Sequence, residues 1–523
     1  MERRGIGRDS RGTRIRTGSH LLTSKRKIKR LLIANRGEIA LRIIRACKEL
    51  DITAVSVYSE VDRTLLHVLK ADEAYPLTGS TPRESYLNQH RIIEIARNAS
   101  VDAIHPGYGF LAENPDFADA VTQSGMIFVG PTGDAIRAMG DKTSARKMAQ
   151  HLGIPTIGGS TEPISNTKDA LKIAADIGYP VLLKAAAGGG GKGMRVVQGA
   201  SEFDAAFRIA QSEAKGAFGD DRVYLEKYLD SPRHIEMQIL ADGYGNVVYL
   251  GERECSIQRR HQKVIEESPS TAVNEQLRRE LGDSAVRLAK AAGYSNAGTL
   301  EFLLDQSGKI YFLEMNTRLQ VEHPVTEAVT GIDLVKEQIR IAEGEPLAFH
   351  QDEIRRTGHA LECRICAEDP LDSFMPSMGR LSQYQLPEGH VRIENGFRQG
   401  DEISVFYDSL MAKVISWGEK RQDAIASMKR ALSDFNIDGV RSTIPFCLFV
   451  LRHQAFVNGD ISTRFIDQYF SPTAMNLDSS DKTLAAAVSA VLIATRGGAN
   501  SIDQAAVTSP EGKWRNGRRE FLR

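Results

Sequence analysis

Alternating apolar strands and amphipathic helices organise the first 140 residues of the chain. Residues 31–35 form a short apolar run, a segment with helical apolar spacing follows, and residues 53–58 form a second apolar run. This order predicts a strand–helix–strand unit whose strands pair in parallel and whose helices cover the sheet. The runs at 101–105 and 126–129 continue the pattern. We therefore expect a mononucleotide-binding-like parallel-sheet domain over residues 28–141.

The pattern changes after residue 141 and divides the remainder into four sections. Residues 142–229 combine helices with strands on either side of a glycine-rich loop, which predicts a small mobile lobe. Residues 230–356 are rich in strands, and residues 357–470 mix strands and helices. Residues 471–523 form a tail with one predicted helix at 484–495. The predicted fold class is therefore multidomain α/β and α+β.

A hairpin of two apolar strands, joined by a turn at 306–309, carries the strongest chemical signal. If the turn centres between Ser307 and Gly308, Glu301 lies directly opposite Glu314. Like charges directly opposite each other are unfavourable in a sheet, unless a cation lies between them. An oxygen-rich site beside substrate phosphates suits Mg²⁺ or Mn²⁺. The hairpin therefore predicts a divalent metal site, and the alternative is a solvated face with scattered charges.

The residues after the second strand extend this polar wall. If the chain stays extended there, every second side chain points in the same direction as Glu314. Those side chains belong to Asn316, Arg318, Gln320 and Glu322. One wall then carries a metal site, a cation for an anionic substrate and a further carboxylate.

A run of glycines, Gly188–Gly191, lies in the loop between two predicted strands. Consecutive glycines let backbone N–H groups approach phosphate oxygens without obstruction. A P-loop needs Ser or Thr after its lysine and then a helix, whereas a glycine and a strand follow Lys192. We therefore predict a hairpin flap that folds over a nucleotide, with a plain linker as the alternative. Lys142 and Lys184 supply cations for the same phosphates.

Two further segments are candidates for substrate contact. Residues 223–229 alternate like a strand end between lobes, where a backbone donor and acceptor with apolar walls suit an adenine. Residues 253–263 form a dense polar run beside apolar strands. They are either an ordinary solvated loop or part of a site that brings Gln258, His261 and Lys263 near an anionic substrate.

The net charge gives no sign of a nucleic acid or membrane partner. The 523 residues hold 67 Lys and Arg against 67 Asp and Glu, so a general affinity for polyanions is not expected. No apolar run approaches the length of a membrane span. Residues 1–30 hold eleven Lys and Arg against two acids. We interpret residues 1–27 as a disordered basic leader of a cytoplasmic protein, with an organellar transit peptide as the alternative.

The five cysteines are too few and too scattered for a disulfide framework, so we expect a reducing compartment. Cys363 and Cys366 match the spacing of a redox pair. They lie in a predicted strand, however, where residues three apart point to opposite faces. Two small buried side chains are therefore the favoured interpretation.

Six motifs, in one order along the chain, resemble those of a known family. They are Ile-Ala-Asn-Arg-Gly-Glu-Ile-Ala at 33–40, His-Pro-Gly-Tyr-Gly-Phe-Leu at 105–111, the glycine loop at 188–194, Gln-Arg-Arg-His-Gln-Lys at 258–263, Glu-Met-Asn-Thr-Arg-Leu-Gln-Val-Glu-His-Pro at 314–324 and Glu-Cys-Arg-Ile-Cys-Ala-Glu-Asp at 362–369. Together they resemble the ATP-grasp fold and, more closely, the biotin carboxylase family. The resemblance spans residues 28–470.

This resemblance implies an ATP-dependent ligase that carboxylates biotin with bicarbonate through carboxyphosphate. It implies that Mg²⁺ or Mn²⁺ is bound by Glu301, Glu314 and Asn316. It implies that Glu322 deprotonates bicarbonate, which would be held by Lys263, Arg318, Gln320 and Val321. The residues expected to contact ATP are Lys142, Lys184, Gly190, Gly191, Glu226, Lys227, Leu229, His234, Gln258 and His261.

On the biotin side, the resemblance implies that Arg364 holds the ureido oxygen as its enolate develops. A guanidinium that keeps its proton suits that task. The loop next to biotin would be formed by Tyr108, Gly109 and Phe110. Family members commonly have Asn at the position of Cys366, which puts the fine positioning of the Arg364 strand in question.

The absence of a biotin-bearing motif from this sequence predicts partner proteins. Multidomain relatives carry biotin on the lysine of an Ala-Met-Lys-Met turn, and no such tetrapeptide occurs here. We therefore expect a separate biotin carboxyl carrier protein and a carboxyltransferase subunit, and the resemblance suggests a homodimer. It favours the biotin carboxylase subunit of an acetyl-CoA or propionyl-CoA carboxylase. Residues 471–523 resemble extensions of such subunits that dock partners, and the alternative is a disordered basic end. The alternatives are the biotin carboxylase component of a two-subunit pyruvate carboxylase and a non-catalytic nucleotide-binding subunit.

Overall fold

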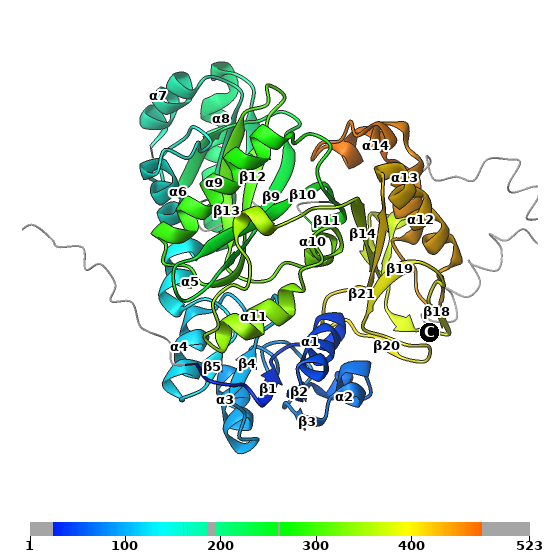
Figure 1. Cartoon of the computed structure of the whole chain (residues 1–523). Helices are drawn as coiled ribbons and strands as arrows, with labels where there is room; N and C mark the ends of the chain where they lie inside the picture. The colour runs from blue at the N-terminus through cyan, green and yellow to red at the C-terminus, as the bar shows by residue number, and fades with distance from the viewer. Residues whose placement is uncertain are drawn as a thin grey trace, which may run out of the picture. The chain divides into compact units, whose positions relative to one another are not determined.

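Five parallel strands form the first sheet, in the order β3-β2-β1-β4-β5 (Figure 1). The structure is a computed structural model that describes residues 25–160, 162–164, 166–185, 194–218, 220–259 and 262–472. The strands are β1 (Arg30–Ile33), β2 (Thr53–Tyr58), β3 (Glu73–Pro76), β4 (Ala103–His105) and β5 (Ile127–Phe128). Their helices are η1 (Glu60–Asp62), α1 (Gly37–Glu49), α2 (Leu66–Lys70), α3 (Gln89–Asn98), α4 (Pro115–Gln123) and α5 (Gly133–Gly140).

Both faces of this parallel sheet are buried, as its continuous apolar strands require. Leu31 and Ile33 pack with residues of α1, and Leu32 packs on the other face with Ile92 of α3 and Phe117 of α4. Strand β3 was not predicted from the sequence. It is a partly exposed edge strand that ends in proline, and its four residues carry no apolar alternation.

A second sheet of three antiparallel strands, in the order β7-β6-β8, forms the small lobe. Helices α7 and α8 pack against it, and the stacked rings of Phe203 and Phe207 fill its core with centroids 5.9 Å apart. The predicted glycine flap lies outside the described residues. The elements of this section are α6 (Lys142–His151), α7 (Thr167–Ile177), β6 (Val181–Ala185), β7 (Met194–Val197), α8 (Ala200–Phe218) and β8 (Val223–Lys227).

The third sheet has eight strands, in the order β13-β12-β9-β10-β11-β14-β21-β19, and every ladder in it is antiparallel. The ladder between β11 and β14 carries the sheet across residue 357, where the strand-rich section meets the α+β section. The strands are β9 (Arg233–Ala241), β10 (Val247–Arg259), β11 (Gln262–Ser268), β12 (Asn296–Leu304), β13 (Ile310–Asn316), β14 (His359–Cys366), β19 (Val391–Asn395) and β21 (Leu410–Gly418).

The polar run at 253–263 is not a solvated loop. Its described residues end β10 and begin β11, and Arg253 and Ser256 are fully buried. The sequence left this alternative open because Cys255 and Ile257 are the only apolar residues of the run. Buried ion pairs and hydrogen bonds, described below, replace apolar contacts here.

Helices cover the long sheet along its length (Figure 1). Helix α9 (Glu275–Ala291) lies on β9 and β10, α10 (His323–Thr330) contacts β10, β11 and β14, α11 (Leu334–Ala342) packs on β12, and α12 (Arg421–Asp434) packs on β14 and β21. The remaining elements are η2 (Gln351–Glu353), β15 (Glu368–Asp369), η3 (Pro370–Asp372), β16 (Met375–Pro376), β17 (Gly379–Arg380), β18 (Gln383–Gln385), β20 (Glu402–Ile403), β22 (Asn436–Asp438), α13 (Ile444–Arg452), α14 (Gln454–Asn458) and α15 (Phe465–Tyr469).

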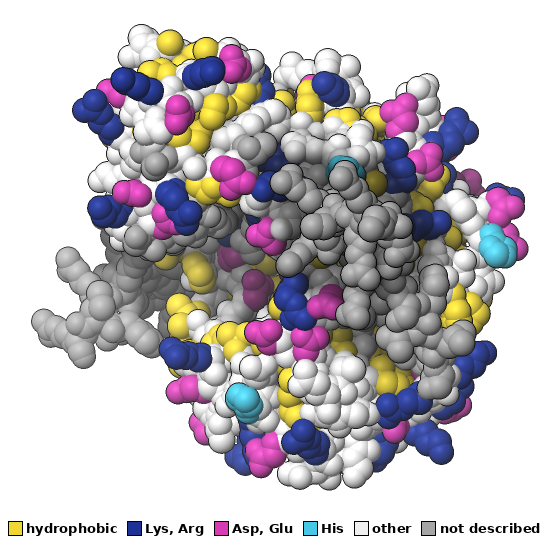
Figure 2. Space-filling view, turned by 90° about the vertical axis from the view of Figure 1, so that its left-hand side faces the viewer, with side chains coloured by type: hydrophobic (Ala, Val, Ile, Leu, Met, Phe, Trp, Pro, Cys, Tyr) yellow, Lys and Arg dark blue, Asp and Glu magenta, His cyan; other side chains and the backbone are white. Residues whose placement is uncertain are grey.

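Charges of both signs are mixed at the surface, and the cysteines lie inside. On the face in Figure 2, Lys and Arg side chains alternate with Asp and Glu, and neither sign gathers into one large area. All five cysteines are free and buried, including Cys363 and Cys366 of β14. Among the described residues, no helix has both the length and the apolar character needed to cross a bilayer.

Candidate active site

The β12–β13 hairpin places Glu301 directly opposite Glu314, as predicted. The turn does not centre where the sequence analysis put it. Near the turn Phe302 pairs with Phe312, and a register shift between Glu301 and Phe302 restores the predicted pairing. An irregularity in the ladder, rather than the turn alone, therefore aligns the two carboxylates.

The three predicted metal ligands lie together, and basic side chains contact the two carboxylates among them. Lys142 Nζ lies 2.7 Å from Glu314, and His234 Nε2 lies 3.1 Å from Glu301. Asn316 Nδ2 donates a hydrogen bond to Glu301 Oε1 at 2.8 Å. Two carboxylates and an amide oxygen form the all-oxygen donor set that Mg²⁺ and Mn²⁺ prefer, so these residues fit a divalent ion.

Lys263 joins the metal side to the rest of the site. Its ammonium lies 2.5 Å from Glu236, 3.0 Å from Glu301 and 2.6 Å from Glu322, which uses all three of its donors. Burial opposes this charge, but the three carboxylates outweigh it and raise the pKa of Lys263 well above its usual value. His234, Glu236 and Glu301 have ligand atoms within 4.8 Å of one another. Because the ammonium already pairs with two of them, we interpret this group as an ion-pair cluster.

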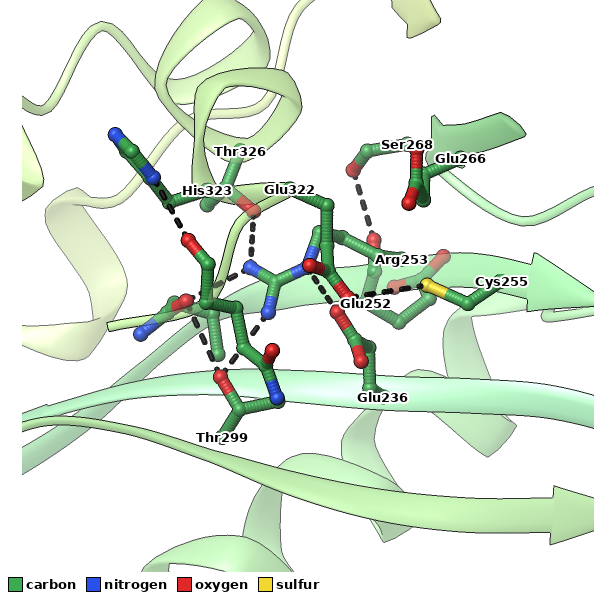
Figure 3. A network of polar contacts seen from close by, with 12 residues as sticks. Glu236, Glu252, Arg253, Cys255, Glu266, Ser268, Thr299, Glu322, His323 and Thr326 are labelled. Atoms are coloured by element: carbon green, nitrogen blue, oxygen red, sulfur yellow. Dashed lines mark hydrogen bonds and ion pairs between the residues drawn. The ribbon is translucent and has the colours of Figure 1, made fainter. Parts of the chain in front are cut away.

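Glu322 is fully buried immediately before α10, beside Cys255 (Figure 3), and it links two parts of the site. One of its oxygens accepts a hydrogen bond from Lys263, and the other accepts from Arg364 Nη2 at 2.9 Å. Burial opposes ionisation, but Lys263, Arg364 and Arg253 outweigh it and hold the pKa of Glu322 well below its usual value. The side chain is therefore a carboxylate at neutral pH, the form that can accept a proton.

The prediction of an extended chain after β13 was wrong. The strand ends at Asn316, and residues 317–322 are irregular until α10 begins. The side chains of this segment still converge, since Arg318 Nη1 donates to Gln320 Oε1 at 3.2 Å and Gln320 Nε2 lies 3.4 Å from Glu301 Oε1. Hydrogen bonds, rather than strand parity, bring the predicted bicarbonate residues to the metal side.

Two charged residues that the sequence analysis missed hold this segment. Glu113 accepts from Arg318 Nε at 2.9 Å and from the backbone N–H of Thr317 at 3.1 Å. Lys413 Nζ donates to the carbonyl of Val321 at 2.7 Å. Lys413 comes from the distant strand β21 and left no signal in the sequence. Glu113 follows the carboxyl end of parallel strand β4, where ligand-binding loops occur, and that position was an available signal.

Arg364 projects from β14 between two buried carboxylates. Its Nε donates to Glu266 Oε1 at 2.6 Å, and its Nη2 donates to Glu322. Burial opposes its charge, but Glu266 and Glu322 outweigh this and raise the pKa of Arg364. Thr443 anchors the strand, because its hydroxyl donates to the carbonyl of Arg364 at 2.8 Å and accepts from the N–H of Cys366 at 3.0 Å. Cys366 therefore leaves the backbone of Arg364 fixed, and Glu266 is a contact that the sequence analysis missed.

The predicted biotin loop, residues 108–110, connects to the same site through Lys413. The hydroxyl of Tyr108 donates to the buried carboxylate Glu38. Lys413 Nζ lies 3.2 Å from Glu38 and also reaches the carbonyl of Val321. One buried ammonium thus links this loop to the segment beside Glu322.

Gly109 and Phe110 turn the loop sharply. Both have positive φ, 67° and 40°, a conformation that glycine tolerates and that phenylalanine rarely adopts. The ring of Phe110 stacks on Tyr86 with centroids 5.0 Å apart and meets the edge of Tyr407 at 6.2 Å. Aromatic packing therefore holds Phe110 in its strained conformation.

Residues on the predicted nucleotide side are paired with one another. Lys184 forms an ion pair with Glu226, and Arg146, which was not predicted, lies 2.7 Å from the same carboxylate. Lys227 Nζ donates to the carbonyls of Gly178 at 3.0 Å and Tyr179 at 2.8 Å. These contacts join the small lobe's strands to the segments around them.

The other predicted nucleotide residues divide into two groups. Gln258 is buried in β10 and lies opposite Lys263 in the ladder, and Leu229 follows strand β8. Gly190, Gly191 and His261 lie outside the described residues.

Three family models match consecutive parts of the chain. The N-terminal domain of biotin carboxylase matches residues 27–136, and the ATP-binding domain of the carbamoyl-phosphate synthase L chain matches residues 141–350. The C-terminal domain of biotin carboxylase matches residues 362–468.

Individual proteins agree with these matches. Biotin carboxylase 1 of Bacillus subtilis (strain 168) is 52% identical over 444 residues, which cover 84% of this chain and 99% of that protein. A pyruvate carboxylase subunit from Methanothermobacter thermautotrophicus is 52% identical over 441 residues, which cover 84% and 90%. The biotin carboxylase domain dimer of 2-oxoglutarate carboxylase from Hydrogenobacter thermophilus, solved with MgADP, ADP and bicarbonate, is 46% identical with a TM-score of 0.82, covering 87% of this chain and all of that one. The chain therefore belongs to the biotin carboxylase family of ATP-grasp enzymes.

Proposed function

We propose that this chain carboxylates biotin with bicarbonate, using ATP and Mg²⁺ or Mn²⁺. The observation that carries the proposal is the position of Glu322. One of its oxygens contacts Lys263, which also contacts the predicted metal ligand Glu301, and the other contacts Arg364. A single carboxylate thus lies between the groups suited to activate bicarbonate and the cation suited to biotin.

The bicarbonate step needs a fixed cation and a base, because bicarbonate is a poor nucleophile toward phosphorus. Arg318 supplies the cation, and Glu113 fixes its orientation before substrate arrives. Gln320 and Val321 belong to the same segment as Arg318, and Lys263 adds a second cation. Glu322, ionised at neutral pH, takes the proton.

The nucleotide step uses cations that are paired with carboxylates in this structure. Lys142 and Lys184 exchange Glu314 and Glu226 for phosphate oxygens when ATP binds. A divalent ion held by Glu301, Glu314 and Asn316 would neutralise charge on the transferred phosphoryl group. The further ATP contacts in this proposal are Gly190, Gly191, Lys227, Leu229, His234, Gln258 and His261.

The biotin step depends on Arg364. Carboxyphosphate is labile in water, so biotin must be held beside it while water is excluded. The ureido nitrogen becomes nucleophilic when negative charge develops on the ureido oxygen, and the guanidinium of Arg364 stabilises that charge. The loop of Tyr108, Gly109 and Phe110 provides the adjacent wall.

The partners in this proposal are a second copy of the chain, a biotin carboxyl carrier protein and a carboxyltransferase subunit. We favour acetyl-CoA or propionyl-CoA as the final acceptor, because residues 471–523 resemble extensions of acyl-CoA carboxylase subunits. The similarity to a pyruvate carboxylase component makes pyruvate the second candidate. Purification of the native complex, followed by assays with all three acceptors, decides between them.

We also propose a cytoplasmic location, which the five free cysteines support. Import directed by the basic leader is the alternative. Fractionation of cells that express the tagged chain separates the two, because import would move the protein into an organelle.

The proposed activity is tested by bicarbonate-dependent ATP hydrolysis, with and without free biotin. We expect hydrolysis to require bicarbonate and Mg²⁺ and to rise when biotin is added. Folded protein that binds MgATP but shows no bicarbonate-dependent hydrolysis would instead be a nucleotide-binding subunit without turnover.

A further inference from the structure

Two buried glutamates lie directly opposite each other behind Arg364. Glu266 of β11 pairs with Glu362 of β14 in the ladder, and both side chains are fully buried. Like charges directly opposite in a sheet repel each other, and burial away from water increases that repulsion. Two ionised carboxylates at these positions would therefore be unfavourable without compensating cations.

The two carboxyl groups have unequal partners. Glu266 Oε1 accepts from Arg364 Nε at 2.6 Å, whereas Glu266 Oε2 and both oxygens of Glu362 have no hydrogen-bond partner among the described residues. The charged groups that act on Glu362 are Glu266 of β11, Lys413 of β21, Arg364 of β14 and Glu322 before α10. Lys413 is already engaged by the carbonyl of Val321 and by Glu38. Within the described part of the chain, Glu362 thus has no hydrogen-bonded cation of its own, although Glu266 does.

A proton on Glu362 removes the repulsion between the two carboxylates. Burial raises the pKa of Glu362 well above its usual value and the pKa of Glu266 to about 7. A protonated Glu362 offers an O–H across the ladder to Glu266 Oε2, which satisfies two otherwise unpartnered atoms. Glu266, which accepts from Arg364, is then the more acidic of the two and is the one that carries the negative charge.

We propose that Glu266 and Glu362 share a single proton, carried by Glu362, and that their one remaining negative charge positions Arg364 for biotin. The inference rests on the proposed role of Arg364. Glu266 and Glu322 engage Nε and Nη2, which leaves Nη1 without a hydrogen-bond partner among the described residues. In this proposal Nη1 is the nitrogen that remains to contact the ureido oxygen.

The shared proton also preserves the positive charge that the reaction needs. A second carboxylate beside Glu266 would offset the charge of Arg364 where negative charge develops on substrate. Glu266 and Glu362 are positioning residues, because neither contacts substrate. As the pH rises and the pair loses its proton, biotin-dependent kcat/KM should therefore fall at a lower pH than bicarbonate-dependent ATP hydrolysis.

Replacing Glu362 and Glu266 one at a time separates the effect of the proton from the effect of the negative charge. Glu362→Gln keeps the neutral charge and a donor, so biotin-dependent kcat/KM at pH 7 should stay within about twofold of wild type, and its decline at alkaline pH should be reduced. Glu266→Gln removes the anion that holds Arg364. It should lower biotin-dependent kcat/KM by about tenfold or more, while bicarbonate-dependent ATP hydrolysis without biotin stays within about twofold.

Glu267→Gln is the matched control, because Glu267 is the next residue and instead pairs with Arg421 at 2.6 Å and His359 at 2.7 Å. It should not lower the biotin reaction selectively. The proposal is overturned if Glu362→Gln, in folded protein, loses biotin-dependent kcat/KM as strongly as Glu266→Gln. Equal losses of both reactions in Glu266→Gln would also overturn it.

Infrared difference spectroscopy tests the proton without relying on activity. At neutral pH the wild-type protein minus Glu362→Gln should show the C=O stretch of a protonated carboxylic acid, which the Glu267→Gln difference should lack. Absence of that band in the Glu362→Gln difference overturns the shared proton even in active enzyme. If wild type shows the band but no bicarbonate-dependent ATP hydrolysis, the proposed function fails and the buried proton stands.

Discussion

At Glu322, the contacts that hold the side chain in place also set its strength as a base. Lys263 and Arg364 hold its pKa low, and a carboxylate with a low pKa is a weak base. Bicarbonate and biotin are the groups that these cations are proposed to bind. When substrates draw the cations away, Glu322 becomes more basic, so its proton affinity is coupled to occupancy of the site.

Glu322→Gln should lower bicarbonate-dependent ATP hydrolysis by about 10²-fold or more, because glutamine cannot take the proton. MgATP affinity should change little, since Glu322 contacts none of the predicted ATP ligands directly in the described residues. Steady-state kinetics and calorimetric titration with MgATP measure the two quantities. Wild-type turnover in this variant would contradict the role of Glu322 as the base.

Arg364→Ala should lower biotin carboxylation far more than it lowers MgATP affinity, because the variant loses the cation proposed for the ureido oxygen. Arg364→Lys is the matched control. It keeps the charge but loses the fork that contacts Glu266 and Glu322, so intermediate activity is expected. Parallel losses of biotin carboxylation and MgATP binding in Arg364→Ala would show that Arg364 has a different role.

At the scale of elements, the sequence predicted those with strong periodicity and missed those stabilised by distant partners. Strand β2 has the predicted bounds, residues 53–58, because its segment is mainly apolar. The buried polar end of β10 was ambiguous, since its stability depends on partners such as Glu236 and Thr299 that bind Arg253. Sequence spacing cannot reveal such pairs, which lie up to dozens of residues apart.

The same distinction holds for the site. Glu301 and Glu314 were predictable because one hairpin relates them. Glu113 and Glu266 were missed, since their contacts with Arg318 and Arg364 span 205 and 98 residues. Local pattern therefore identified the side chains proposed for chemistry, and the fold was needed to identify those that orient them.

The ladder between β11 and β14 is reinforced by a buried ion-pair group, which gives a prediction for the element. Arg421 of α12 binds Glu267, as does His359. Arg421→Ala should lower the free energy of unfolding by about 3 kcal/mol, because it deprives a buried carboxylate of its main cation. Denaturant titration measures the change, and the exposed neighbour Gln422→Ala should leave it within about 0.5 kcal/mol. Equal effects of both variants would contradict this account.

At the scale of the whole molecule, buried histidines set an acid limit on stability. Burial lowers the pKa of His67 to about 4 and that of His105 to about 3. The unfolded chain binds these protons near pH 6.5, whereas the folded chain does not. Stability is therefore fully present above pH 6.5 and falls as the pH drops toward the folded-state values.

His67→Gln should reduce this pH dependence. Between pH 7 and pH 5, His67 should account for a loss of about 2 kcal/mol in the free energy of unfolding, which the variant lacks. Denaturant titrations of both proteins at the two pH values measure the difference. An unchanged pH dependence in the variant would show that His67 is protonated in the folded protein.

The eight-stranded sheet has a practical consequence for dividing this enzyme. A cut between residues 356 and 357 would break no strand, yet it would place β11 and its pairing partner β14 on different fragments. Each fragment would present a strand edge whose backbone N–H and C=O groups are unpaired, which is the usual template for aggregation. We therefore expect neither piece to stay soluble alone, and a split version should function only when both pieces are produced together.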